Sequence, residues 1–239
     1  MIDAGSSSSK HIGEYTVEPF LLSKGITELD KVFITHADSD HTSGILYLSE
    51  SGKVRIGQLY LPYSARDDEK YDKLREICGD VCYLRAGDEI DPGVGSISVL
   101  GPVEGNADNT SDTNEQSLIL LYTENNFSAL FMGDAPVSSE QAMLDFVSSQ
   151  GAGLPRDITV LKTGHHGSST STSPELLEAT HPRLAILSYG EGNRYGHPHR
   201  ETLELLSEYS IPHLDTALSG AITMLTDGHS MEISEFLSR

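Results

Sequence analysis

Residues 36–41, HADSDH, place two histidines and two aspartates within six positions. They follow "KVFIT", a short apolar run that predicts a buried β-strand. Burying ionisable side chains together is costly unless they are paired or hold a metal. His36, Asp38, Asp40 and His41 therefore predict a polar site at a strand end, and this favours a fold in which loops converge over the end of a rigid sheet.

Other predicted strands also end in polar residues. "LFMG" runs into Asp134, and "TVLKTG" runs into His165 and His166. "LAILSYG" leads to a loop with Asn193, Arg194 and His197. Because mixed α/β folds place their sites at such ends, we expect these side chains to meet.

The rest of the chain alternates between strand and helix patterns. Residues 117–134 predict a hairpin, and residues 220–234 predict a second one with Asp227 and Gly228 at its turn. Helical patterns cover 66–78, 138–149 and 173–180, and 101–116 reads as a surface loop. Strands that come both as hairpins and with intervening helices predict an α+β fold with two mixed sheets and helices outside, an αββα sandwich in one domain over 1–239.

The net charge is −20, with 36 Asp and Glu against 16 Lys and Arg. Such a chain repels polyanions at long range, so we do not expect an autonomous high-affinity DNA binder. A metal-loaded site supplies its own positive charge, so a nuclease is not excluded. No apolar run is long enough to cross a bilayer, no signal peptide is visible, and we expect the given chain to be soluble.

The residue types point to divalent metals. Imidazole and carboxylate together suit Zn²⁺, Mn²⁺ or Fe²⁺. His36 and Asp38 alternate in an extended segment, and Asp40 and His41 are neighbours in a turn, so one loop can serve two ions. Asp134 is then placed to bridge ions about 3.5–4 Å apart.

At this level of detail the sequence resembles a known family. "HADSDH" resembles the signature loop of the metallo-β-lactamase superfamily, "FMGDA" its bridging-aspartate motif and "MIDAG" its strand-end aspartate motif. "LKTGHHGSSTSTS" and "GNRYGHPH" resemble the C-terminal metallo-hydrolase domain of the ComEC family, the DNA-internalisation channels of competent bacteria. The resemblance implies the metallo-β-lactamase sandwich.

Three departures from the family pattern shape the expectations. Asp38 stands where a histidine is usual, which makes Mn²⁺ more plausible beside Zn²⁺. Asn114 stands in the third histidine motif, so we expect the first ion to be weakly held. The chain begins at the aspartate motif, so we expect a fragment that lacks the first strands and belongs to a longer membrane protein, with this domain on the extracytoplasmic side.

The resemblance also implies roles. His36, Asp38 and Asn114 would bind the first ion, Asp40 and His41 the second, and Asp134 both. His166 is favoured over His165 as a metal ligand, which leaves His165 to face the substrate, but the choice stays open. Asp3 would orient a ligand. The residues given to water activation, proton donation or substrate contact are Asp40, His197, Arg194, Asn193 and Ser168.

We therefore expect a metal-dependent phosphodiesterase that degrades DNA during uptake. It would bind DNA weakly, through the metal site. Two alternatives remain: a hydrolase of small phosphate esters, lactones or thioesters, which the −20 charge favours, and a degenerate non-catalytic domain, which Asn114 favours. The sequence does not predict an oligomeric state.

Overall fold

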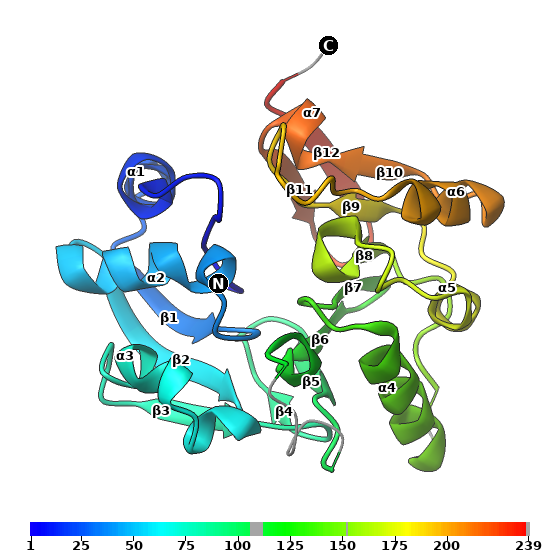
Figure 1. The fold of residues 1–239 in the computed structure, drawn as a ribbon, viewed down its shortest axis with the longest axis horizontal. Coiled ribbons are helices and arrows are strands. Elements are labelled where there is room, and N and C mark those ends of the chain that lie inside the picture. The colour runs from blue at the N-terminus through cyan, green and yellow to red at the C-terminus, as the bar shows by residue number, and fades with distance from the viewer. Residues whose placement is uncertain (106–111, 152, 238–239) are drawn as a thin grey trace.

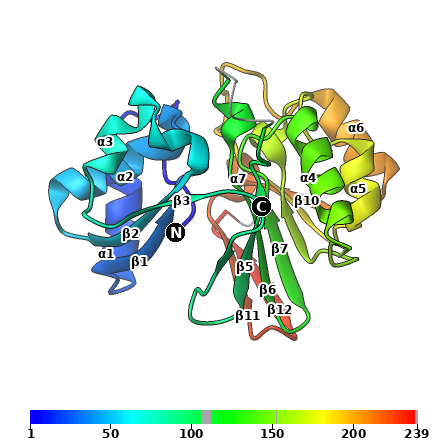
Figure 2. The same cartoon turned by 90° about the horizontal axis from the view of Figure 1, so that it is seen from below.

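The structure is a computed structural model that describes residues 1–105, 112–151 and 153–237. Two sheets form the middle of the molecule, and helices cover their outer faces (Figure 1). The view from below shows the four layers, with α2 outside the first sheet and α4 to α6 outside the second (Figure 2). The predicted αββα arrangement is confirmed.

The first sheet is parallel, in the order β1-β2-β3. Its strands are β1 (Glu28–Phe33), β2 (Arg55–Pro62) and β3 (Val81–Leu84). The helix α2 (Ser39–Ser51) joins β1 to β2. The chain enters through η1 (Gly13–Val17) and α1 (Glu18–Ser23), which the sequence did not predict.

The helix predicted over 66–78 is wrong. The chain there forms three short turns, η2 (Tyr63–Arg66), η3 (Glu69–Tyr71) and α3 (Asp72–Arg75). The Asp68 carboxylate accepts from the Lys70 backbone N–H at 2.9 Å and starts a new turn. Arg75 then folds back to donate to the Asp68 carbonyl at 3.2 Å. Local side-chain bonds thus compete with a continuous helix.

The second sheet has the order β10-β9-β8-β7-β6-β5-β4. The strands β7 to β10 are parallel and β4 to β7 antiparallel, as the mixture of hairpins and crossovers predicts. Its strands are β4 (Glu89–Ile90), β5 (Ser96–Gly101), β6 (Ile119–Glu124), β7 (Phe127–Phe131), β8 (Val160–Lys162), β9 (Ala185–Leu187) and β10 (His213–Asp215). Its helices are α4 (Val137–Ser149), α5 (Pro174–Thr180), α6 (Arg200–Glu208) and α7 (Thr216–Ser219).

The buried apolar residues fall into layers. Val32 and Leu59 pack with Ile45 of α2, whereas Leu161 packs with Met143 of α4. A third cluster contains residues of both sheets, including Phe33, Tyr60, Leu84, Val99, Leu118 and Leu120. Burying this much apolar surface between the layers fixes where the strand ends lie.

The C-terminal hairpin pairs β11 (Ile222–Thr226) with β12 (Met231–Glu235), and the predicted turn at Asp227 is confirmed. The η4 helix (Asn114–Gln116) lies within the predicted loop 101–116, of which 106–111 fall outside the described residues. No helix in the described ranges has both the length and the apolar character of a membrane span.

Candidate metal centre

The segments after three strands, β1, β7 and β8, deliver one cluster of side chains. His36 follows β1, His41 lies in the first turn of α2, Asp134 follows β7 and His166 follows β8. The Asp134 carboxylate lies at the centre: its oxygens are 3.3 Å from His41 Nε2, 3.4 Å from His166 Nε2 and 3.9 Å from His36 Nε2. These groups are brought together from positions up to 130 residues apart in the chain (166 − 36).

Asp40 and Asp38 border this cluster. The Asp40 carboxylate is 3.7 Å from His166 Nε2, and Asp38 is 3.8 Å from His36 Nε2. Two ligand groups result, one of His36, His41 and Asp134, and one of Asp40, His41 and His166. Within each group the candidate ligand atoms lie within 4.8 Å of one another.

Buried polar atoms without partners show that the cluster fits a metal. His36 Nε2, His41 Nε2, His166 Nε2 and Asp134 Oδ1 are buried, and none has a hydrogen-bond partner. Leaving such atoms unsatisfied costs free energy, and ligation of a cation removes that cost. Imidazole nitrogen and carboxylate oxygen are donors that Zn²⁺ and Mn²⁺ accept. The residues present therefore fit a divalent ion.

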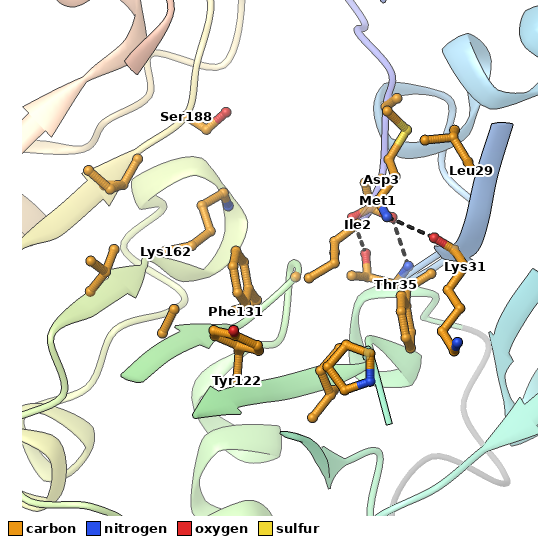
Figure 3. Close-up of a pocket in the computed structure, with 18 of the residues that line it drawn as sticks. Met1, Ile2, Asp3, Leu29, Lys31, Thr35, Tyr122, Phe131, Lys162 and Ser188 are labelled. Atoms are coloured by element: carbon orange, nitrogen blue, oxygen red, sulfur yellow. Dashed lines mark hydrogen bonds between the residues drawn. The ribbon is translucent and has the colours of Figure 1, made fainter. Parts of the chain in front are cut away.

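Asp3 holds His41 in a ligating orientation. Its Oδ2 lies 2.8 Å from His41 Nδ1, and the Thr35 backbone N–H donates to Oδ1 at 2.8 Å (Figure 3). With Nδ1–H donating to the carboxylate, the lone pair of His41 Nε2 points toward Asp134. Gly44 makes this possible, because a Cβ there would lie 2.5 Å from the Ala4 carbonyl oxygen beside Asp3.

The turn after β8 separates His165 from His166. Both residues have positive φ values, 44° and 57°, so the chain reverses sharply between them. His166 Nδ1 lies 2.7 Å from the Ser188 carbonyl oxygen, which frees Nε2 for the cluster. His165 Nε2 lies 3.8 Å from Asp134, and its ring is half-exposed. His166 belongs to a ligand group and His165 does not, so the arrangement favours His166 as the ligand.

The ionisable groups of the cluster shift one another's pKa values. Burial lowers the pKa of His36 to about 4, helped by the neighbouring His41 charge. Burial also opposes the charge on His41, but the Asp3 and Asp134 carboxylates outweigh it and raise the pKa of His41 to about 10. Burial alone raises the pKa of Asp134, yet the close approach of the His166 and His41 rings brings it well below its usual range. The cluster thus holds an ionised carboxylate among imidazoles.

Thr113 is a contact that the sequence did not reveal. Its hydroxyl donates to Asp38 Oδ1 at 2.9 Å and fixes that carboxylate. Asn114 is the next residue, and its backbone N–H donates to Asp112. Among the described residues, no hydrogen bond joins the Asn114 side chain to the histidines, so its role as a ligand stays a prediction.

The loop 190–199 brings His197 to the rim. Its ring centroid lies 5.4 Å from that of His165 and 6.1 Å from that of His166. Asn193 braces this loop: its Oδ1 accepts from the His197 N–H at 2.9 Å, and its Nδ2 donates to the His197 carbonyl at 2.6 Å. Asn193 thus supports the shape of the loop, and its contact with a substrate stays a prediction.

The roles expected for Ser168 and His197 stay predictions, and the surroundings of both side chains bear on them. Ser168 is only 3% exposed and pairs with the Thr170 hydroxyl at 3.0 Å, so it does not face an open site. Burial and the charges of His165 and His166 lower the pKa of His197 to about 4. A ring that is neutral at pH 7 suits a hydrogen bond to substrate better than proton donation. Arg194, by contrast, is exposed.

A large, mostly apolar cavity of about 1380 Å³ reaches the cluster from between the sheets. Ile2, Phe131 and Tyr122 line it, and Asp3 and Thr35 face one another at its edge (Figure 3). Lys162 also points into this cavity, and its ammonium donates to the Thr163 carbonyl at 2.9 Å (Figure 3). Burial lowers the pKa of Lys162. Lys162 therefore lines the cavity rather than the rim of the cluster.

Glu140 of α4 anchors the segment that carries the two histidines. Its buried carboxylate accepts from the backbone N–H groups of Thr172 at 2.6 Å and Ser173 at 2.8 Å. Ser171 adds a bond from its hydroxyl to the Ala135 carbonyl at 2.8 Å. The segment with His166 is thereby tied to the one with Asp134. The sequence did not predict this role, because a glutamate in a predicted helix is usually exposed to solvent.

Comparisons with known proteins agree with this architecture. The family model described as the metallo-β-lactamase superfamily matches residues 1–105. The chain is 33% identical over 215 residues to ComE operon protein 3 of Bacillus subtilis (strain 168), covering 88% of this chain and 26% of that protein. It is 30% identical over 222 residues to competence protein ComA of Neisseria gonorrhoeae, covering 93% of this chain and 28% of that protein.

The fold recurs in a solved structure of low sequence identity. CmlA, a diiron β-hydroxylase from Streptomyces venezuelae, superposes with a TM-score of 0.55 at 15% identity, covering 79% of this chain and 44% of that one. This likeness shows the fold alone.

The family model over residues 1–105 and the residues of the cluster make the chain similar to the metallo-β-lactamase superfamily. The chain is also similar over most of its length to part of the ComEC-type competence proteins, and it spans about a quarter of the length of the curated relatives it matches.

Proposed function

We propose that this chain is a metal-dependent phosphodiesterase that cleaves DNA. The observation that carries the proposal is the set of buried, unpartnered ligand atoms around Asp134. Two ligand groups share His41, which supports a centre for two divalent ions, Zn²⁺ or Mn²⁺. Asp38 and Asn114, in place of histidines, would complete the group around His36, and this supports weaker loading of the first ion.

Each residue of the site would have a separate role, according to where it lies relative to the cluster. Divalent ions in such a site lower the pKa of water and offset the negative charge that develops on a phosphate oxygen. Asp40, whose side chain is 23% exposed beside His166, is placed to orient the attacking water and take its proton. His165 and His197 are partly exposed beside the cluster, where they would hydrogen-bond to the substrate.

The groups beside the cluster favour a phosphodiester substrate over a lactone or a thioester. Arg194 lies on the rim, and a guanidinium matches two phosphate oxygens. The similarity to competence proteins supports DNA as the substrate and a role in its uptake. As part of a longer protein, the domain would then act outside the membrane, beside the channel that carries DNA inward.

The test is hydrolysis by metal-reconstituted protein. The substrates are labelled single- and double-stranded DNA and a chromogenic phosphodiester, each with Mn²⁺, Zn²⁺ and Mg²⁺. We expect DNA cleavage with Mn²⁺ or Zn²⁺. Failure to cleave DNA with every metal, alongside rapid turnover of small esters, would instead support the small-molecule hydrolase that the −20 charge suggests.

The matched variant is Asp134→Ala. Removing the carboxylate between the two ligand groups should lower the bound metal and abolish cleavage of both substrate types. Metal content is read by elemental analysis after desalting. Unchanged metal content would remove Asp134 from the centre. Full metal content without hydrolysis of any ester in the wild-type protein would favour the non-catalytic alternative.

A further inference from the structure

A second pocket adjoins the metal cluster. It measures about 470 Å³ and is lined by Ala37, Asp38, Ser39 and Asp40 of the cluster loop, together with Ser7, Lys70, Arg194 and Tyr195. The same loop therefore serves the cluster and one wall of this pocket. A substrate bound at the cluster could therefore extend its adjacent chemical groups into this pocket.

Two cations from different parts of the fold border the pocket. Lys70 lies in η3, between the first sheet's strands β2 and β3, and Arg194 lies in the loop that follows β9 of the second sheet. The chain has only 16 Lys and Arg in 239 residues, so a lysine and an arginine at one small pocket stand out against the −20 background. Asp38 and Asp40 line the same pocket and balance these two cations, but under the proposed function both carboxylates would bind divalent ions, and the pocket would then suit a group with negative charge.

Tyr195 orders the arginine. The Arg194 guanidinium carbon lies 4.8 Å from the centroid of the Tyr195 ring, and its Nη2 donates to the Tyr195 hydroxyl at 2.5 Å. The Tyr195 ring in turn stacks on His197, with centroids 5.6 Å apart and planes at 20°. Stacking and the hydrogen bond restrict the side chain, so less entropy is lost when it binds an anion.

We propose that this pocket holds a second phosphate of a nucleic-acid strand, next to the phosphate that is cleaved. Arg194 and Lys70 clamp this phosphate, and Tyr195 is the positioning residue that orients Arg194. The proposal rests on the proposed function and deepens it: the substrate is a chain with consecutive phosphodiesters. A lone phosphate ester fills the cluster and leaves the clamp unused.

Salt dependence of binding tests the clamp without relying on activity. The probe is a fluorescein-labelled single-stranded oligonucleotide with phosphorothioate linkages, which resists hydrolysis, and its affinity for Mn²⁺-loaded protein is read by anisotropy. Each phosphate contact to a single strand contributes about 0.7 to the slope of log affinity against log salt. Because both cations hold the same phosphate, Lys70→Ala and Arg194→Ala should each lower the slope by at most that amount and weaken binding several-fold.

The control is Arg156→Ala. Arg156 is exposed and precedes β8, so it lies at the opposite end of that strand from His166, and its loss should leave the slope unchanged. Tyr195→Leu should weaken binding as Arg194→Ala does, whereas Tyr195→Phe, which keeps the ring, should recover part of the affinity. Thermal unfolding of each variant checks the fold.

The outcomes separate this proposal from the proposed function. Equal slopes for Lys70→Ala, Arg194→Ala and Arg156→Ala overturn the clamp, and so does the absence of measurable binding by the wild-type protein. If the slopes change as expected but unmodified DNA is not cleaved with any metal, the clamp stands and the nuclease fails. If DNA is cleaved, Lys70→Ala should raise the KM for an oligonucleotide more than that for a chromogenic diester.

Discussion

Asp3 shows how a residue outside the ligand groups can control them. Its carboxylate belongs to neither candidate ligand group. It instead accepts hydrogen bonds from His41 Nδ1 and from the backbone N–H and the hydroxyl of Thr35. It therefore fixes which nitrogen of His41 points at Asp134. Such carboxylate–histidine pairs orient the ring and raise its strength as a ligand.

Asp3→Asn should lower the affinity for Mn²⁺ or Zn²⁺ by roughly 10–100-fold, because the amide removes the negative charge that supports His41. The measurement is titration of metal into metal-free protein by calorimetry. Asp30→Asn, an exposed aspartate of β1, is the control and should not change the affinity. Identical affinities for Asp3→Asn and the wild-type protein would show that Asp3 serves the fold alone.

At the scale of elements, α4 links two strand-end segments through Glu140. This side chain is fully buried and accepts two backbone N–H groups from the segment that follows the histidine turn. Burial raises the pKa of Glu140, and the bonds to Ser173 and Thr172 oppose that rise. A carboxylate tolerates such a position only when its oxygens are satisfied.

Glu140→Ala should lower the free energy of unfolding by about 2–4 kcal/mol, because it leaves two buried N–H groups without acceptors. Denaturant titration measures the change. Gln141→Ala, at the next and exposed position of α4, should stay within about 0.5 kcal/mol of the wild-type protein. Losses of equal size in both variants would mean that the buried bonds of Glu140 do not set the effect.

The turn of the C-terminal hairpin should respond to pH. Asp227 accepts from the N–H groups of Ser230 at 2.7 Å and His229 at 2.9 Å. These bonds lower the pKa of Asp227 from 3.8 to about 2. A carboxyl with a lowered folded pKa stabilises the fold above its unfolded pKa, and that stabilisation is lost as the pH falls through the folded pKa.

The turn should therefore loosen between about pH 4 and pH 2, and the Ser230 amide should exchange faster with solvent over that range. Hydrogen exchange followed by NMR reads this amide directly. The side chain of Asp227→Asn does not titrate, so in this variant the Ser230 amide should not show the increase in exchange between pH 4 and pH 2. An equal increase in exchange in that variant would mean that another titrating group opens the turn.

At the scale of the whole molecule, total charge and local charge act differently. The chain carries −20, but interactions between exposed charges are screened beyond about 8–10 Å at physiological salt. The charged groups near the cluster therefore decide how strongly a polyanion binds, and these include Lys70, Arg194 and any divalent ion that the carboxylates and histidines would hold.

We expect weak DNA binding by this chain alone and cleavage that falls steeply as salt rises, because ion release drives phosphate contacts. The kcat/KM for DNA and for a chromogenic diester should be compared across a salt series. The DNA value should fall much more than the diester value, which has few phosphates to contact. Parallel declines would place the salt effect on the metal centre instead.

Local patterns were sufficient to predict the fold class and the strand ends at which the cluster lies. Strand ends at His36, Asp134 and His166 could be read from short apolar runs, because a buried strand needs only its own residues to be recognised. The family resemblance added the pairing of these ends in space. The hairpins and most helices followed from periodicity and turn residues in the same way.

Tertiary contacts alone decided which way the side chains point. Ser188 turns His166 toward Asp134, the His197 backbone occupies Asn193, and Lys162 faces the cavity between the sheets. The anchor at Glu140 and the pocket between Lys70 and Arg194 likewise join residues that are far apart in the chain. A sequence determines which groups are available near each strand end, but their partners are set by the packing of distant segments, because a side chain takes the orientation that satisfies its buried neighbours.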